Sequence, residues 1–280
     1  MISHWIEAMR LRTLPVSVAG VITGWAYALR EGSFNTLAAG LCLAVALLGQ
    51  IASNFANEYY DYKNGIDRPG REGPRRGVTE GDITPRAMRN ATYLTLGLCG
   101  CCGLALAWMA GWWLLLIGVA ILLGALAYSA GPFPLSQNGL GEVAVILFFG
   151  VVPVIFTTYT VGGEISTESV YGSVCIGLLA ANVLVVNNYR DCDDDRKVDK
   201  NTLAVKLGSQ FMPLLYAFNA LIALALIWQQ WSTKLVPILI GIVAIIIAVR
   251  LRALKGTKLN PMLGITAMLL FVYSLLFILL

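Results

Sequence analysis

The sequence has very little histidine and very little charge. His4 is the single histidine among 280 residues, and charged residues make up 13% of the chain, about half their share in an ordinary soluble domain. One histidine in a terminal tail argues against a histidine-ligated metal centre and against a Ser-His triad. The Walker pattern of glycines followed by Lys-Ser or Lys-Thr is also missing, so we expect no P-loop nucleotide site.

Long hydrophobic runs are abundant, and hydrophobic residues make up 58% of the chain. A membrane-spanning helix needs about 20 mostly apolar residues. Nine stretches meet this requirement: 14–30, 37–60, 86–108, 112–130, 138–160, 169–189, 209–229, 234–252 and 262–280. We therefore expect an all-α integral membrane protein, with nine transmembrane helices in a single domain over residues 1–280 and no cleaved signal peptide.

Positive charges predict the orientation in the membrane, because Lys and Arg are retained in cytoplasmic loops. With the N-terminus inside, 18 of the 20 Lys and Arg residues lie on the cytoplasmic side, and only Arg30 and Lys234 lie outside. We expect an inner-membrane, multi-pass protein with the N-terminus and the basic loops on the cytoplasmic side. Topology accounts for the net charge of +4, so no nucleic-acid partner is needed.

Acidic residues gather in two segments. Eleven of the sixteen lie there: Glu58, Asp61, Asp67, Glu72, Glu80 and Asp82 in one, and Asp191, Asp193, Asp194, Asp195 and Asp199 in the other. The segments follow the second and the sixth apolar stretch, so the predicted topology brings both to the cytoplasmic face. Stretches 57–61 and 187–191 agree at three of five positions, which suggests two related half-sites that face each other.

Helical spacing places Glu58 and Asp61 on one helix face, and Asp191 and Asp195 on another. Like charges at this spacing repel, and an Asp within the bilayer costs roughly 2.5–3.5 kcal/mol, so both clusters require cations. Oxygen ligands suit a hard ion, and Mg²⁺ commonly shares its coordination with substrate phosphates. With Lys and Arg nearby, the two half-sites predict a diphosphate clamp.

Two further segments have features of a functional site. Glu142 follows Gly139-Leu140-Gly141 near the inner end of an apolar stretch, and an ionisable residue there is a candidate for function. The Gly- and Pro-rich segment 63–85 is expected to form a lid. Thr84-Pro85 and Asn260-Pro261 predict an N-cap followed by a first-turn proline for the helices that they precede.

These residues resemble the UbiA superfamily of intramembrane prenyltransferases over most of the chain. Asn57-Glu58-Tyr59-Tyr60-Asp61, followed by Asp67, is similar to the first Asp-rich motif of that family, and Asp191 with Asp195 is similar to the second. The resemblance implies nine helices around a central cavity. It also implies that Mg²⁺, held by the two motifs, binds a prenyl diphosphate.

Four stretches resemble the branch that prenylates 1,4-dihydroxy-2-naphthoate in menaquinone synthesis. They are 12–15, the interval between Asp61 and Asp67, 139–150, and 187–208. The resemblance implies transfer of a polyprenyl chain to that ring, with loss of CO₂ and formation of demethylmenaquinol. Glu58, Leu11 and Lys206 depart from the residues common in this branch, but each keeps the charge or the apolar character of the common residue.

Specific residues follow as candidates for each role. Asp61, Asp191 and Asp195 are the catalytic candidates, and the metal candidates are Asn57, Asp61, Asp67, Asp191 and Asp195. Candidates for contact with the diphosphate are Lys63, Arg75, Arg76 and Lys200. Candidates for contact with the aromatic acceptor or the allylic cation are Arg12, Tyr60, Tyr128, Glu142, Asn188 and Tyr189.

Two alternatives remain open at this point. A prenyltransferase of the same family could act on another aromatic acceptor, such as 4-hydroxybenzoate or homogentisate. A cation-coupled transporter also places carboxylates and asparagines on membrane helices, but transporter sites lie near the bilayer midplane, whereas these acids gather at one face.

Overall fold

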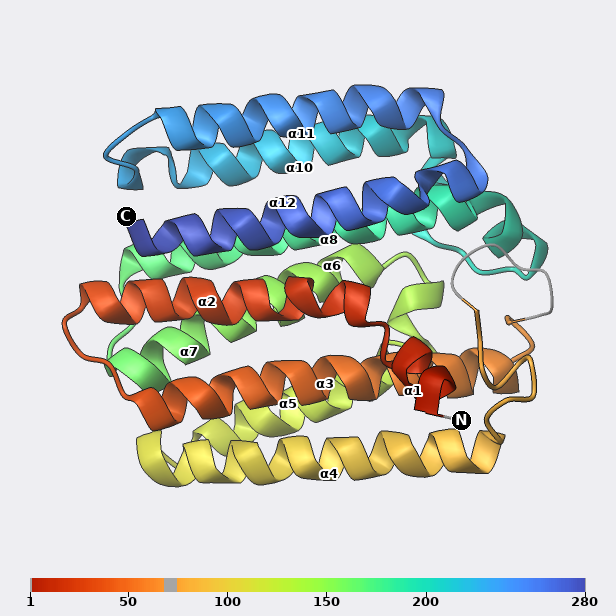
Figure 1. The fold of residues 1–280 in the computed structure, drawn as a ribbon, viewed down its shortest axis with the longest axis horizontal. Coiled ribbons are helices and arrows are strands. Elements are labelled where there is room, and N and C mark those ends of the chain that lie inside the picture. The colour runs from red at the N-terminus through yellow and green to blue at the C-terminus, as the bar shows by residue number, and fades with distance from the viewer. Residues whose placement is uncertain (1, 68–74, 280) are drawn as a thin grey trace.

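The computed structural model describes residues 2–67 and 75–279, which form helices joined by loops (Figure 1). Residues 68–74 of the expected lid lie outside the described residues. The longer helices are α1 (Ile2–Met9), α2 (Leu14–Arg30), α3 (Thr36–Lys63), α4 (Pro85–Ala110), α5 (Leu114–Ala127), α7 (Val152–Gly162), α8 (Thr167–Lys197), α10 (Met212–Leu226), α11 (Leu235–Ala253) and α12 (Asn260–Leu276). The short helices α6 (Gly141–Val145) and α9 (Leu203–Leu207) and the π-helical η3 (Ile146–Val151) complete the framework.

Seven helical segments of the described residues are long and apolar enough to cross a membrane. They are 36–63, 85–110, 141–162, 167–197, 209–226, 235–253 and 256–279, the third being α6, η3 and α7 in continuous succession. Two expected spans correspond to shorter helices, because α2 has 17 residues and α5 has 14. The chain is therefore an all-helical, multi-pass membrane protein.

Capping residues explain where several helices begin. The Thr84 side chain accepts a hydrogen bond from the Ala87 backbone N–H at 3.2 Å, and Pro85 occupies the first turn of α4, as predicted. Pro261 likewise occupies the first turn of α12, as predicted, but the prediction that Asn260 is the N-cap was wrong. Leu259 is the N-cap of α12, and the Asn260 side chain instead accepts a hydrogen bond from Arg190, so a tertiary contact takes the place of the local cap.

Helix α8 lies at the centre of the bundle. In an apolar stretch of 18 residues within α8, 67% of the residues are buried, against 28% to 39% in the corresponding stretches of the other long apolar helices. It packs against α2, η3, α10 and α12. A Cβ atom at Gly150 of η3 would collide with the backbone of Gly177 on α8, so this glycine permits the close approach of the two helices.

The two acidic segments lie at the same end of the bundle. The last turns of α3 and α8, helix α1 and the described part of the 64–84 segment share that end, and the C-terminus of α12 lies at the opposite end (Figure 1). The fold thus brings together two segments that are more than a hundred residues apart in the sequence.

Candidate active site at the end of α3 and α8

The first half-site forms where α3 ends. Asp61 is 1% exposed, and its backbone carbonyl accepts hydrogen bonds from the N–H groups of Ile66 and Asp67 at 2.9 and 3.2 Å. These bonds turn the chain back on itself, so that the buried Asp67 lies close to Asp61. Arg76 then reaches Asp67 across the loop, with 3.1 Å between Nε and Oδ2.

Arg10 extends this half-site from the loop between α1 and α2. Its Nη2 donates to Asn57 Oδ1 at 3.0 Å, and Asn57 Nδ2 donates to Ser129 Oγ at 3.1 Å. Burial and, to a smaller extent, the charge of Arg76 lower the pKa of Arg10 to about 9. Arg10 has a φ of 52°, a left-handed conformation that is rare for an arginine and costs free energy.

The second half-site forms at the end of α8. Arg190 donates to both oxygens of the neighbouring Asp191, from Nε at 2.6 Å and from Nη2 at 2.9 Å. The guanidinium is also held by Asn187 at 2.8 Å and by Asn260 at 3.0 Å. A bidentate Arg–carboxylate pair with two further acceptors has a well-defined orientation.

Asp195 lies one turn beyond Asp191, and the chain then folds back over it. The Asp195 carbonyl accepts the Lys200 backbone N–H at 3.0 Å, and Lys200 Nζ lies 3.6 Å from Asp195 Oδ1. Asp199 has a φ of 54°, the left-handed conformation that this tight turn needs and that Asp tolerates better than most residues. The Asn201 N–H donates to the Gln137 carbonyl at 2.9 Å, which anchors the turn to the loop before α6.

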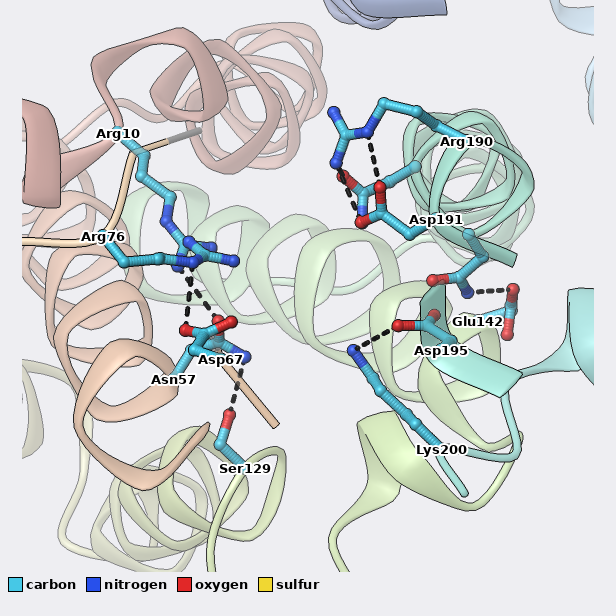
Figure 2. A network of polar contacts seen from close by, with 12 residues as sticks. Arg10, Asn57, Asp67, Arg76, Ser129, Glu142, Arg190, Asp191, Asp195 and Lys200 are labelled. Atoms are coloured by element: carbon cyan, nitrogen blue, oxygen red, sulfur yellow. Dashed lines mark hydrogen bonds and ion pairs between the residues drawn. The ribbon is translucent and has the colours of Figure 1, made fainter. Parts of the chain in front are cut away.

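A buried pair lies beside the second half-site. Asn188 Nδ2 donates to Glu142 Oε1 at 2.8 Å, and both side chains are buried. Figure 2 shows Arg10, Arg76, Asn57, Asp67 and Ser129 on one side, and Arg190, Asp191, Glu142, Asp195 and Lys200 on the other. The two groups face each other, each with carboxylates and cations in contact.

An apolar cavity of about 430 Å³ lies next to the polar cluster. Ala46, Gly49 and Ser53 line it on α3, and Asn57 follows Ser53 one turn later on the same helix face. Tyr128 lines the cavity from the end of α5, and further walls come from α2, α4, η3 and α7. The fold thus places apolar space beside a cluster of charged side chains.

Several predicted site residues lie away from this cluster. Arg12 and Lys63 are exposed. The Tyr60 hydroxyl is 3.3 Å from the Tyr93 hydroxyl of α4, and Tyr189 packs against the main hydrophobic core of the bundle.

The two adjacent arginines of the loop are separated. Arg75 Nη2 is 2.6 Å from Asp82 Oδ2, and Nη1 is 3.0 Å from His4 Nδ1 and 3.7 Å from Glu7 Oε2. Arg75 thus ties the loop to α1, while Arg76 turns inward. The sequence reasoning missed Arg10, Ser129 and Arg190 as members of the cluster. The similarity between stretches 57–61 and 187–191 could have identified Arg190, because Arg190 directly precedes Asp191 in the second stretch.

The donor set suits a hard divalent cation that is completed by a substrate. Within the part of the chain that the structure describes, no group of three or more His, Cys, Asp or Glu side chains lies close enough to hold a metal ion. Mg²⁺ is usually bound by one or two carboxylates together with substrate phosphates rather than by an all-protein cage. The buried Asp61 and Asp67 on one side, and Asp191 and Asp195 on the other, fit this mode of binding.

Comparison with known proteins gives consistent matches. The model of the UbiA prenyltransferase family matches residues 18–275. A 1,4-dihydroxy-2-naphthoate octaprenyltransferase of Escherichia coli is 39% identical over 210 residues, which cover 73% of this chain and 68% of the relative. The enzyme of the same name from Mycobacterium tuberculosis is 35% identical over 279 residues, which cover 98% of this chain and 94% of the relative.

Solved structures share the fold. The structure of a UbiA homolog from Archaeoglobus fulgidus bound to DMAPP and Mg²⁺ superposes with a TM-score of 0.68 at 16% identity, and the match covers 99% of each chain. A digeranylgeranylglyceryl phosphate synthase gives a TM-score of 0.65 at 18% identity over 99% of this chain and 97% of that chain.

Proposed function

The chain belongs to the UbiA prenyltransferase family, and from this premise we propose that it transfers a polyprenyl chain from its diphosphate to 1,4-dihydroxy-2-naphthoate. The ring loses its carboxylate as CO₂, and the product is the demethylmenaquinol precursor of menaquinone. Relatives named for the naphthoate reaction span most of this chain, which supports this acceptor over a single-ring one.

The observation that carries the proposal is the pair of facing half-sites beside an apolar cavity. The half-sites combine buried carboxylates with the cations Arg10, Arg76, Arg190 and Lys200. The cavity begins at Ser53, one helical turn before Asn57. A diphosphate with a long isoprenoid tail has this distribution of charge and apolar surface. A soluble metabolite would not use the cavity.

Mg²⁺ is the proposed cofactor. Asn57, Asp61 and Asp67 would hold it on one side, and Asp191 and Asp195 on the other. When bound, it would neutralise charge on the diphosphate as a Lewis acid. Arg190 would release Asp191 on binding and remain held by Asn187 and Asn260.

The residues of the chain would carry out the rest of the chemistry. Arg10, Arg76 and Lys200 would bind the diphosphate and stabilise the charge that develops as the allylic C–O bond breaks, which is stabilisation by preorganised charge. The ring of Tyr128, which lines the cavity, would face the allylic cation, since aromatic faces attract cations. The cavity walls would hold the tail and exclude water from the cation.

The proposal includes the topology. Seven long apolar helices together with α2 and α5 would make nine spans, with the N-terminus and both half-sites on the cytoplasmic side of the plasma membrane. The positive charges near the half-sites support this orientation.

A product assay on purified protein tests the proposal. With Mg²⁺ and a long-chain prenyl diphosphate, we expect turnover of 1,4-dihydroxy-2-naphthoate with release of CO₂, and turnover of 4-hydroxybenzoate and homogentisate at least about tenfold slower, because a loosely held ring costs about 1–3 kcal/mol in the transition state. Chelation should abolish activity and Mg²⁺ should restore it. Equal turnover of a single-ring acid would refute the acceptor but leave the family reaction intact.

A further inference from the structure

Glu142 is a buried carboxylate that the proposed binding of metal and diphosphate leaves unused. It is 6% exposed. Its Oε1 accepts the hydrogen bond from Asn188 at 2.8 Å, and its buried Oε2 has no hydrogen-bond partner among residues 2–67 and 75–279. A buried polar atom without a partner costs about 1–3 kcal/mol, and more when it is charged. The arrangement therefore favours a ligand that brings a donor to Oε2.

The position of Glu142 points to the reacting end of the substrates. It lies in the first turn of α6, where the preceding Gly141 approaches Tyr128. A Cβ atom on Gly141 would lie 3.7 Å from the Tyr128 hydroxyl oxygen. Val145, one turn after Glu142, lines the apolar cavity together with Tyr128. Glu142 is thus placed where the cavity meets the polar cluster, on the side of Asp195 and Lys200 (Figure 2).

The backbone around Glu142 is built to hold it there. Directly after α6 the helix adopts the π form over Ile146–Val151, an irregularity that is frequent at functional sites. Asn188 lies on α8 one turn before Asp191, so the helix that carries the second half-site also orients the Glu142 carboxylate through Oε1. Oε2 is left available to a further hydrogen-bond donor.

We propose that Glu142 is the general base for the aromatic acceptor, and that Oε2 accepts the proton of the ring hydroxyl next to the carboxylated carbon. This inference rests on the proposed function and assigns one residue to the acceptor half of the reaction. Asn188 is a positioning residue, because it acts through Glu142.

The step balances without any further reactant. The ring carbon that bears the carboxylate forms a bond to the allylic carbon, and the electron pair of the breaking C–O bond leaves with the diphosphate. The hydroxyl O–H bond breaks, its proton moves to Oε2, and its electron pair forms a carbonyl. The bond to CO₂ then breaks, its electron pair restores the aromatic ring, and Glu142 returns the proton to oxygen. The net reaction releases diphosphate and CO₂ and consumes no proton.

The test compares Glu142→Gln with Glu168→Gln. Glutamine keeps the size of the side chain and an oxygen for Asn188 but cannot take a proton. Glu168 lies at the opposite end of the bundle in an ion pair with Arg30 at 3.2 Å, so it provides the same chemical change away from the site. We expect Glu142→Gln to lower kcat for prenyl transfer about 100-fold or more, the usual contribution of general base catalysis, and Glu168→Gln to change kcat less than about threefold.

Two further measurements separate a base from a structural residue. The first is the Mg²⁺-dependent Kd of an S-thiolodiphosphate analogue of the prenyl donor, whose C–S bond resists ionisation; Glu142→Gln should leave this Kd within about twofold of the wild-type value. The second is kcat with ring-halogenated acceptors, whose hydroxyl is more acidic. The defect of Glu142→Gln should shrink as the hydroxyl becomes more acidic, because the base is then needed less.

The outcomes are distinct. A kcat of Glu142→Gln within threefold of wild type, loss of analogue binding in parallel with kcat, or a defect that is the same for every acceptor would each overturn the role as base. If wild-type protein fails with the naphthoate but prenylates another hydroxy acid, the proposed acceptor fails, and the same comparison is then made with the acceptor that works.

Discussion

At the scale of single residues, the site pairs three of its buried carboxylates with cations. Asp67 has Arg76, Asp191 has Arg190 and Asp195 has Lys200. Paired charges lower the large cost of desolvating each one, so the half-sites can be assembled before a substrate arrives. In the proposed function the same cations would bind the diphosphate, which would replace the carboxylates as their negative partner.

Arg75 and Arg76 should differ sharply in function. Arg76→Gln should raise the KM for the prenyl diphosphate tenfold or more, because a hydrogen bond to a charged group is worth roughly 1.5–3 kcal/mol. Arg75→Gln should stay within about threefold of wild type, since Arg75 pairs with Asp82 and Glu7 on the outer side of the loop. Steady-state kinetics on the two purified variants measures this, and equal losses would contradict the assignment of Arg76 to the diphosphate.

At the scale of elements, a hydrogen bond and apolar packing hold the loop that carries Arg76 against α3. Glu58 is fully buried, and its Oε1 accepts the Val78 backbone N–H at 3.0 Å. Val78 and Ile83 of the loop also form a hydrophobic cluster with Phe55 and Met88. Glu58 therefore supports the site through the loop, although its spacing to Asp61 first suggested a place within the charged cluster.

Removing the hydrogen bond between Glu58 and Val78 should make the loop more mobile. Glu58→Ala should speed amide hydrogen exchange at Val78 and raise the KM for the prenyl diphosphate, because a bond to a charged acceptor worth roughly 1.5–3 kcal/mol is lost. Glu80→Ala changes an exposed residue of the same loop and serves as the control, with exchange close to wild type. Unchanged exchange at Val78 in Glu58→Ala would show that the hydrophobic cluster alone holds the loop.

The apolar cavity should limit the length of the donor. Ala46→Phe places a ring in the cavity and should lower kcat/KM for a long-chain donor at least about tenfold more than for a five-carbon donor, since overfilling packed space costs roughly 1–3 kcal/mol. Leu94→Phe on the exposed face of α4 is the control and should affect both donors equally. An equal loss for both donors in Ala46→Phe would mean that the tail lies elsewhere.

At the scale of the whole molecule, the two ends of the bundle differ in charge. The half-sites and most Lys and Arg residues share one end, whereas the Arg30–Glu168 pair and the C-terminus lie at the other (Figure 1). Such an asymmetry of positive charge orients a multi-pass protein during insertion.

Reporter cysteines test the orientation. In a background without the six native cysteines, positions 63, 200 and 255 should react with an impermeant thiol reagent only from the cytoplasmic side, and positions 31 and 168 only from the outside. The expectation follows from retention of positive loops in the cytoplasm. Labelling of position 168 from the cytoplasm alone would overturn the nine-span topology, while the pairing of the half-sites would still stand on the fold.

The sequence by itself determined the class of fold and pointed to the candidate site. Apolar runs of helical length are a local property, so each of the nine expected stretches overlaps a helix of the described residues. Asp61, Asp67, Asp191 and Asp195 were recognisable because charge is costly at these positions and its clustering is visible along the chain.

Only the tertiary structure decided which side chains meet. Arg10 with Asn57, Asn57 with Ser129, and Glu142 with Asn188 are pairs separated by 47, 72 and 46 residues. Asn260 could cap its own helix or bind Arg190, and the packing of α12 beside α8 selected Arg190. Periodicity specifies the face of a helix on which a residue lies, but its partner depends on how neighbouring helices are packed, and that information is not local to any segment.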